Sequence, residues 1–538
     1  MSTKPDVDAW INASIRDDVR GRREGPKTEL SQGNIDSMLS FSDWRVEINA
    51  TGRNSYFWPP TVVGYETLVR SSCTCSGLSP GRANVLVTMD DHIKEEAAAA
   101  DDYSAVMHQI RAEICRVFEL PPGTGVITAP SGTDAEYAAL TLVRMLHPKS
   151  ERIRTVITCV NETGKGCVAA AMGKPHSPVT PLSAAPAEPA WTFDDFLECT
   201  QLPARDRDGV NVDAMATVHE LAAASSAPLV VHVVHGSKCN RVEPWRTLAS
   251  EAPDAYILVD ACQTRMPNAE LGDMLRGDAM VMITGSKFYQ GPPFSGALLV
   301  PPSMMAIVSR LSEETVRESM APLLGNYFVA DDFPAELPHC RAALPATANT
   351  GSALRWLCAL TEARAYADSA APDARAALVE RWRLRMVELC AEFEGISMFE
   401  ASESIVNLKL TVPGGRSLKP AELRKLFEWL TTDMAGDVSA LLPDAKLSDE
   451  RLAALRTPCM IGQPVDVCAD FGIVRLALGS VDIRLCVAPG ASTDAFEKLV
   501  ITDKTIMTKI DILTRYFDQL DGAKKDSLRR MYCRAPTH

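Results

Sequence analysis

Two apolar runs, AYILVD at residues 255–260 and AMVMIT at residues 279–284, decide the fold of this chain. Neither run alternates with polar residues. Continuous apolar runs of this length are typical of strands that are buried on both faces of a parallel sheet. The first run ends on Asp260, and Lys287 follows the second after a short Gly-Ser turn. We therefore expect neighbouring buried strands whose carboxyl ends carry polar side chains.

Runs of the same kind occur nearer the amino terminus, and helical stretches separate several of them. They are GVITA at residues 125–129, RTVITCV at 154–160 and PLVVHVV at 228–234. Two expected helices cover residues 93–119 and 134–146, where apolar residues recur every three or four positions. Alternation of buried strands with helices predicts an α/β fold with a mostly parallel sheet.

The texture of the chain changes on both sides of this pattern. Residues 1–60 are polar and irregular, and we expect them to form an N-terminal arm. The large sheet domain is predicted at residues 61–330. From 331 to 538, Ala/Leu/Arg-rich helices combine with short strands such as IVNLKLT at 405–411, and the chain ends in a helical tail. This second texture predicts a smaller α+β domain.

Composition excludes several classes of function. The 538 residues include 55 Lys and Arg against 69 Asp and Glu, a net charge of −14, which disfavours nucleic-acid binding because such binding needs a basic surface. There is no apolar run of about 18 residues that would cross a membrane. The 15 cysteines follow no secretory signal and form no CxxC pair, so we expect reduced thiols in the cytoplasm and no metal site.

A possible anion site lies between the strand at 125–129 and the helix that follows it. The segment PSGTDAE, residues 130–136, places Ser131, Gly132 and Thr133 at the start of that helix. Backbone N–H groups and the helix dipole favour an anion there, and the two hydroxyl groups add donors. The sequence therefore predicts a phosphate site. The alternative is an ordinary N-cap in which Glu136 completes a capping box.

Two further polar residues fall where open α/β sheets bind ligands, at the carboxyl ends of strands. Asp260 is either a functional acid or the cap of the next helix, and Lys287 is either a nucleophilic amine or an exposed loop residue. Together with a phosphate site, an acid and a lysine are what pyridoxal 5′-phosphate (PLP) requires. The lysine would hold the aldehyde as a Schiff base, and the acid would keep the pyridine nitrogen protonated.

These residues also carry a family resemblance. The strings VDACQ at 259–263, GSK at 285–287 and GPPFSGALLV at 291–300 resemble the corresponding segments of fold-type I PLP enzymes, most closely the class V aminotransferase and cysteine desulfurase group. The resemblance covers about residues 60–500. It implies the type I PLP-dependent transferase fold, PLP as cofactor, and an amino acid or keto acid as substrate. It also implies a homodimer, because this group builds each active site at a subunit interface.

The resemblance assigns roles by position. Lys287 would be the Schiff-base lysine and proton shuttle, and Asp260 would pair with the pyridinium. Arg475, in the segment IVRLALG, matches the arginine that binds the substrate carboxylate, although a surface strand arginine is the alternative. The other implied cofactor contacts are Ser131, Gly132, Thr133, Thr163, Ser237, Gln263, Thr284 and Ser286.

Several positions depart from the group's pattern and leave the reaction open. Ser286 stands where many relatives have a histidine before the lysine, and Ser237 replaces an asparagine. Glu162 or Thr163 would cover the ring face in place of an aromatic side chain. The first hypothesis is amino-group transfer.

Two alternatives to amino-group transfer remain at this point. One is a C–S lyase or cysteine desulfurase, in which Cys459 of the segment TPCMIGQP would carry sulfur. The other is a non-catalytic scaffold that retains the PLP fold.

Overall fold

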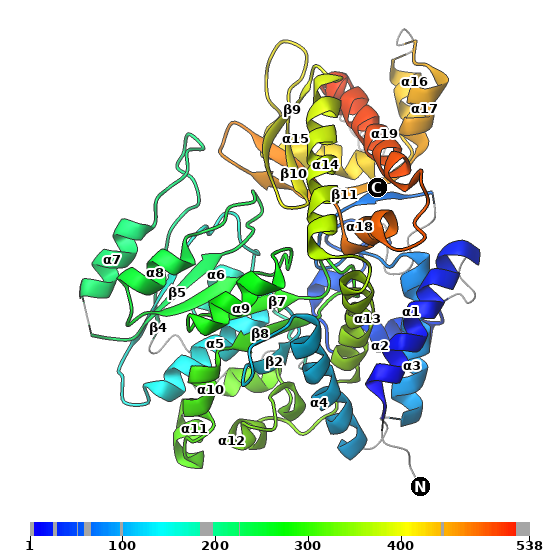
Figure 1. Ribbon diagram of the computed structural model, residues 1–538. Helices are drawn as coiled ribbons and strands as arrows, with labels where there is room; N and C mark the ends of the chain where they lie inside the picture. The colour runs from blue at the N-terminus through cyan, green and yellow to red at the C-terminus, as the bar shows by residue number, and fades with distance from the viewer. Residues whose placement is uncertain are drawn as a thin grey trace, which may run out of the picture. The chain divides into compact units, whose positions relative to one another are not determined.

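In the computed structural model the chain forms two compact units (Figure 1). One unit comprises Met1–Val63, Ser72–Pro372 and Gly479–Arg484, and the other comprises Gly64–Ser71, Asp373–Leu478 and Leu485–His538. Within them, the structure describes residues 5–24, 30–50, 52–58, 66–96, 100–182, 197–224, 226–442 and 446–522.

The larger unit is built on a seven-stranded sheet in the order β2-β8-β7-β6-β5-β3-β4. All neighbouring strands are parallel except that β8 runs antiparallel to both β2 and β7. The strands are β2 (Gly125–Ala129), β3 (Ile153–Ile157), β4 (Leu197–Gln201), β5 (Leu229–Val234), β6 (Tyr256–Asp260), β7 (Met280–Thr284) and β8 (Gly296–Val300). The predicted mostly parallel α/β sheet is confirmed.

Strand β8 enters the sheet through a glycine that no other residue could replace without a shift. A Cβ atom added to Gly296 would lie 2.5 Å from the carbonyl carbon of Ser131. This close approach brings the start of β8 against the turn that precedes the helix after β2. The antiparallel strand therefore packs directly against the turn in which the phosphate site is predicted.

Helices cover the sheet of the larger unit, and α5 packs against β2, β6, β7 and β8 (Figure 1). The helices of this unit are α1 (Val7–Glu24), α2 (Gln32–Leu39), η1 (Trp44–Val46), α3 (Pro80–Glu96), α4 (Ala100–Val117), α5 (Gly132–Leu146), α6 (Cys167–Ala171), α7 (Met215–Ala224), α8 (Trp245–Glu251), α9 (Asn268–Arg276), α10 (Pro302–Val308), α11 (Glu313–Ser319), η3 (Pro322–Asn326), η4 (Ala330–Asp332), α12 (Pro338–Ala342) and α13 (Thr350–Ala367).

The N-terminal region corrects the expectation of an irregular arm over residues 1–60. It holds α1 and α2, and it belongs to the larger unit. Helix α1 packs against α3 and α13, with Ile11 fully buried and the Trp10 ring stacked 5.0 Å from the ring of His92. Val7, Trp10 and Ile11 have the three- and four-residue spacing of a helix face, but only one such face is apolar.

Two further boundaries differ from the predictions. The helix expected at 93–119 is two helices, since α3 ends at Glu96 and α4 begins at Ala100. The second unit begins at Asp373 rather than at residue 331, because α13 is part of the larger unit. Arg355 and Trp356 of α13 donate hydrogen bonds to the backbone oxygens of Phe294 and Gly296, which ties this helix to the large sheet.

The smaller unit has a five-stranded sheet in the order β1-β11-β12-β10-β9, in which only β1 and β11 are parallel. The predicted α+β texture is confirmed. Its strands are β1 (Leu68–Arg70), β9 (Ile396–Ser402), β10 (Ile405–Leu410), β11 (Cys459–Asp466) and β12 (Gly472–Ala477). The remaining helices are α14 (Pro372–Ala391), α15 (Pro420–Leu430), α16 (Ala435–Leu441), α17 (Asp449–Arg456), α18 (Ser480–Val487) and α19 (Ala495–Arg515).

A buried carboxylate explains why residues 479–484 belong to the larger unit. Glu362 of α13 forms ion pairs with Arg82 of α3 and with Arg484 of α18, the latter at 2.8 Å. Ser480 donates a further hydrogen bond to Glu362 at 3.0 Å. Because a buried carboxylate is costly without cations, these contacts hold the short segment in place.

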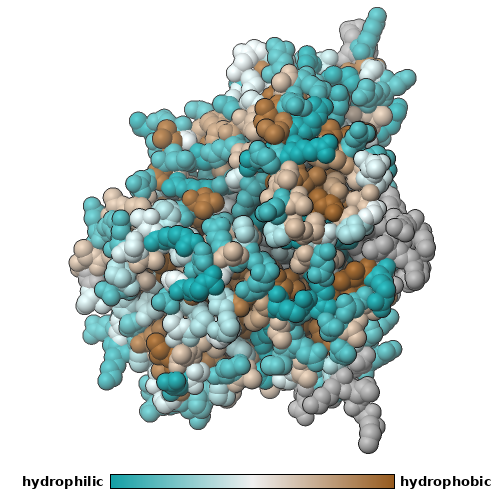
Figure 2. Space-filling view, in the orientation of Figure 1, coloured by the Kyte–Doolittle hydropathy of each residue, from teal (hydrophilic) through white to brown (hydrophobic). Residues whose placement is uncertain are grey.

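Among the described helices, none is long and apolar enough to cross a membrane. The face seen in Figure 2 is hydrophilic over most of its area, with separate hydrophobic patches between the polar side chains.

A buried lysine in the smaller unit donates hydrogen bonds to backbone carbonyl groups at the carboxyl ends of two helices. Lys509 of α19 donates through Nζ to the backbone oxygens of Leu430, Thr432 and Thr457, at 3.0, 2.7 and 2.7 Å. Burial lowers the pKa of Lys509 to about 8. These carbonyl groups lie at the ends of α15 and α17, where helices leave acceptors unsatisfied.

We predict that Lys509→Met destabilises this unit, because three buried carbonyl groups lose their donor. The free energy of unfolding should fall by about 2–4 kcal/mol. Lys504→Met on the same helix is the matched control, since Lys504 is exposed and pairs with the surface residue Glu392; its effect should stay below about 1 kcal/mol. Urea denaturation followed by circular dichroism measures both, and equal effects would contradict the prediction.

Candidate active site

Lys287 and Asp260 lie at the same edge of the large sheet. Asp260 is the last residue of β6, and Lys287 follows the end of the parallel neighbour β7 by three residues. The ammonium of Lys287 lies near enough to help lower the pKa of Asp260. It makes no hydrogen bond or ion pair with any residue that the structure describes. The two side chains therefore face a common region, with the lysine amine available.

Asp260 is held in its charged form. Burial by itself raises the pKa of this carboxyl group, but His232, Lys287 and the backbone N–H of Cys262 outweigh it and bring the pKa below the usual range. Oδ1 accepts a hydrogen bond from the N–H of Cys262 at 3.1 Å, and Oδ2 lies 3.9 Å from Nε2 of His232. A carboxylate in this state can hold a protonated pyridine nitrogen.

A second buried acid, Glu136, contacts the other ring nitrogen of His232. Nδ1 of His232, in β5, lies 2.7 Å from Oε2 of Glu136 in α5, and both side chains are 1% exposed. The contact has the distance of an ion pair but not the angles of a hydrogen bond. Burial opposes protonation of His232, yet Glu136 and Asp260 raise its pKa well above the ordinary value. Glu136, His232 and Asp260 thus form a row in which a histidine lies between two carboxyl groups, and the row ends at the carboxyl end of β6.

Sequence reasoning missed this row. His232 is the one polar residue in the apolar run PLVVHVV, and that interruption was the available signal. Glu136 was considered only as part of a capping box, but the N-cap Ser131 makes no side-chain capping bond and Glu136 lies beside His232. The capping-box alternative is therefore wrong.

The start of α5 has the form expected of an anion site. The N–H groups of its first two residues, Gly132 and Thr133, have no hydrogen-bond partner among the described residues, whereas that of Asp134 donates to the backbone oxygen of Ser131 at 3.1 Å. A Cβ added to Gly132 would lie 2.1 Å from Sγ of Cys262, so only glycine lets the backbone approach so closely. Oγ1 of Thr133 lies 3.7 Å from Sγ of Cys167. The hydroxyl group of Ser131 is already occupied, because it donates to Asp134 at 2.7 Å and accepts from Arg45 at 3.1 Å.

Ser286 and Thr284 both place a hydroxyl group near Lys287, but only that of Ser286 is available to bind a ligand. Ser286 is 1% exposed, and its Oγ has no hydrogen-bond partner among the described residues. Thr284 donates through Oγ1 to the backbone oxygen of Cys262 at 2.7 Å. An unpartnered buried hydroxyl beside Lys287 and the free N–H groups of α5 fit a group rich in acceptor oxygens.

The remaining predicted cofactor contacts differ in what they can offer. Oε1 of Gln263 accepts from the hydroxyl of Ser72 at 2.8 Å, which fixes the side chain and leaves its amide N–H group as the donor. Thr163 donates to the backbone oxygen of Val160 at 3.3 Å. No described contact links Thr163 to Asp260 or Lys287.

The structure gives no support to Glu162 as the residue covering the ring. Its carboxylate accepts from Nε of Arg205 at 2.8 Å and from the hydroxyl of Ser237. Ser237 also accepts from the N–H of Arg241. Glu162 and Ser237 therefore bond to each other and stabilise the turn after β5.

An N-terminal residue that the sequence did not single out reaches the start of α5. Arg45, in η1, pairs with Asp43 at 2.6 Å and lies 3.7 Å from Oδ2 of Asp134. Its guanidinium also stacks 4.7 Å above the ring of Phe294, in the loop after Lys287. The N-terminal region therefore forms one wall of the candidate site.

The two remaining candidates belong to the smaller unit. Arg475 is buried in β12, and its Nε donates to the backbone oxygen of Gln463 at 3.3 Å. Cys459 is the first residue of β11 and fully buried, and burial raises the pKa of its thiol to about 11. Reactive cysteines have a lowered pKa and are accessible, so Cys459 lacks the properties of a sulfur carrier.

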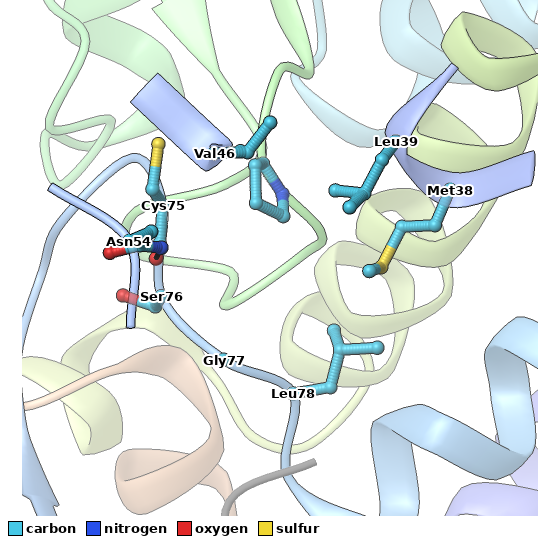
Figure 3. A pocket seen from close by; sticks show the side chains of 9 residues that line it. Met38, Leu39, Val46, Asn54, Cys75, Ser76, Gly77 and Leu78 are labelled. Atoms are coloured by element: carbon cyan, nitrogen blue, oxygen red, sulfur yellow. Dashed lines mark hydrogen bonds between the residues drawn. The ribbon is translucent and has the colours of Figure 1, made fainter. Parts of the chain in front are cut away.

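Two cavities elsewhere in the larger unit do not coincide with these residues. One of about 10 Å³ lies beside the N-terminal region (Figure 3) and has room for about one water molecule. It is lined by Met38, Leu39, Val46, Asn54, Cys75, Ser76, Gly77, Leu78 and Pro293. The other, of about 1150 Å³, includes His147, His219 and Tyr256 and lies at the opposite ends of the strands from Lys287. Among the described residues, no cluster of His, Cys, Asp or Glu could hold a metal ion.

Comparison with solved structures finds similar backbones in three kinds of enzyme. A phosphoserine aminotransferase from Cytophaga hutchinsonii is 14% identical, with a TM-score of 0.46 over 82% of this chain and 99% of that one. The glutamate decarboxylase domain of a Vibrio parahaemolyticus protein is 11% identical, with a TM-score of 0.49 over 93% and 95%. A cysteine desulfurase from Escherichia coli is 12% identical, with a TM-score of 0.45 over 82% and 95%.

No family model and no curated protein sequence matches this chain. At this level of similarity, none of the three solved structures assigns a reaction to it. The chemistry must be argued from its own residues.

We predict that His232→Phe destabilises the larger unit, because Glu136 and Asp260 then remain buried without the cation between them. The loss should be about 3–5 kcal/mol near pH 6. The pKa of His232 is higher in the folded protein than in the unfolded chain, where it is about 6.5. The stability that the protonated histidine contributes is therefore fully present below about pH 6.5, and it is lost as the pH rises through the pKa of the folded protein. The difference from the wild type should therefore shrink at alkaline pH.

The control for this variant is His219→Phe, which removes a partly exposed histidine that pairs with Glu251 on the surface. Its effect should be below about 1 kcal/mol. Thermal unfolding at a series of pH values measures both variants. If His232→Phe is as stable as the wild type throughout the series, a protonated His232 does not stabilise Glu136 and Asp260, and the prediction is wrong.

Proposed function

We propose that this chain is a PLP-dependent enzyme of fold-type I that transfers an amino group between an amino acid and a keto acid. The observation that carries the proposal is the placement of a charged Asp260 and a Lys287 without an ion-pair partner among the described residues at the ends of two neighbouring parallel strands. The unpartnered hydroxyl of Ser286 and the approach of Gly132 to Cys262 complete a fit to a phosphorylated aromatic aldehyde.

Each residue has a distinct role in holding the cofactor. Lys287 would be joined to the aldehyde carbon, and Asp260 would face the pyridine nitrogen. Ser286 and the N–H groups of Gly132 and Thr133 would hold the phosphate. When bound, PLP draws electrons from the bonds at the substrate Cα.

The chain's own part in the reaction is proton transfer and orientation. Nζ of Lys287 is the base that takes the proton from the substrate Cα, a role for which a lysine with no competing partner is suited. Asp260, kept charged by His232, holds a proton on the pyridine nitrogen. Arg475 would bind the substrate carboxylate, since a planar guanidinium suits two parallel hydrogen bonds.

Amino-group transfer is preferred over the two alternatives on the state of particular residues. Sulfur transfer needs an accessible thiolate, whereas Cys459 is buried with a raised pKa. A non-catalytic scaffold has no need of a buried cation that keeps Asp260 charged, or of an unpartnered Lys287. A homodimer that binds small amino acids or keto acids in the cytoplasm remains part of the proposal.

We predict that Lys287→Ala abolishes covalent attachment of PLP. Wild-type protein incubated with PLP and reduced with borohydride should carry a pyridoxyl group on the peptide that contains Lys287, as measured by mass spectrometry. Amino-group transfer from a panel of amino acids to keto acids should fall by at least about 100-fold in the variant. Lys238→Ala, in the turn after β5, is the control and should label normally. Labelling of another lysine in the wild type would overturn the assignment.

A further inference from the structure

Asn407 carries a fully buried side-chain amide with nothing to bond to. It lies in β10, is 0% exposed, and neither Oδ1 nor Nδ2 has a hydrogen-bond partner among the described residues. Folding has removed water from both groups without replacing its hydrogen bonds, which is unfavourable. Such groups are rare in native proteins, and each one calls for an explanation.

The register of the smaller sheet places this amide next to Arg475. Asn407 of β10 is directly opposite Arg475 of β12 in the antiparallel pair. Directly opposed residues of an antiparallel pair project from the same face and contact each other. The unpartnered amide and the predicted carboxylate-binding guanidinium are thus neighbours on one face of one sheet.

The strand on the other side of Arg475 leaves room for its guanidinium. Gly462 of β11 is opposite Arg475, and a Cβ added there would lie 2.9 Å from Cβ and 3.2 Å from Nε of the arginine. Nε is fixed by its bond to the backbone oxygen of Gln463 at 3.3 Å. With Nε anchored, the two terminal nitrogens of the guanidinium form a fork that can face a ligand.

The two side chains supply complementary donors for one anion. A carboxylate has about four lone-pair positions, of which a guanidinium fork fills two. An amide N–H group adds a donor without adding a second positive charge, so it does not repel Arg475. A small planar carboxylate has enough acceptor positions for both the fork and the amide.

We propose that Asn407 donates a hydrogen bond from Nδ2 to the same substrate carboxylate that Arg475 binds. The inference rests on the proposed function, which supplies a carboxylate substrate. It explains why the chain keeps a buried amide that weakens the empty protein: the hydrogen bond is completed only when the carboxylate is present. Asn407 is then a substrate-binding residue that trades stability for affinity.

The first test compares the stability of the empty protein. Asn407→Leu replaces the amide by an apolar group of similar size, so its melting temperature without added carboxylate should equal or exceed that of the wild type. Asn349→Leu is the matched control, because Oδ1 of Asn349 accepts from the N–H of Ser352 at the start of α13. That variant should melt at a lower temperature. If Asn407→Leu also lowers the melting temperature, the amide is satisfied in solution and the proposal fails.

The second test measures binding of a carboxylate alone. Acetate should raise the melting temperature of the wild type more than chloride at the same ionic strength, and acetamide should not. The apparent dissociation constant for acetate should rise by about tenfold in Asn407→Leu, equivalent to about 1.4 kcal/mol, and protection should be absent in Arg475→Ala. Equal protection of wild type and Asn407→Leu, or no protection of the wild type, overturns the proposal.

These results separate the proposal from the proposed function. Acetate binding and melting temperature are measured without cofactor, whereas the PLP assignment is tested by labelling of Lys287. Labelled Lys287 with no dependence of acetate binding on Asn407 would refute only the role of Asn407. Asn407-dependent binding without labelling of Lys287 would leave a carboxylate site in a protein that does not use PLP.

Discussion

The electrostatic balance at Asp260 is the constraint on which the candidate site depends. A carboxyl group at the end of a buried strand would take up a proton unless a cation faces it, and His232 supplies that cation from the neighbouring strand. His232 needs its own compensation, which Glu136 provides from α5. The parallel order of β5, β6 and β7 brings these groups and Lys287 to one edge. The ionisation of Asp260 therefore depends on the strand order, because β5 must lie beside β6 for His232 to reach Asp260.

The sequence predicts the sheet well because its strands are buried on both faces. Continuous runs such as AYILVD are unlike helices or surface strands, so β5, β6 and β7 were located to within a residue or two. Strands without such a run were missed: β4 is half exposed and β1 has three residues. The N-terminal helices were missed because α1 has a single narrow apolar face. The domain boundary was misplaced because the burial of α13 depends on hydrogen bonds to distant backbone groups of β8.

In the candidate site too, residues marked by their local sequence were predicted, and residues brought close only by the fold were not. Lys287, Asp260 and Gly132 were identified because each occupies a recognisable position after a strand. The supporting residues were not, since Arg45, Ser72 and His232 come from other parts of the chain and only the fold brings them close. In the same way, nothing in the string IVNLKL indicates that the side-chain amide of Asn407 lacks a hydrogen-bond partner. Only its register opposite Arg475 makes it notable.

The discontinuous path of the chain has a consequence for its synthesis. The larger unit is completed by Gly479–Arg484, which the ribosome makes only after all five strands of the smaller sheet. Until then, Glu362 has Arg82 but not Arg484 or Ser480 as a partner. Before residues 479–484 are made, the buried carboxylate of Glu362 in the larger unit therefore lacks two of its three side-chain partners. Neither unit can be made as one uninterrupted fragment, so the chain matures as a whole.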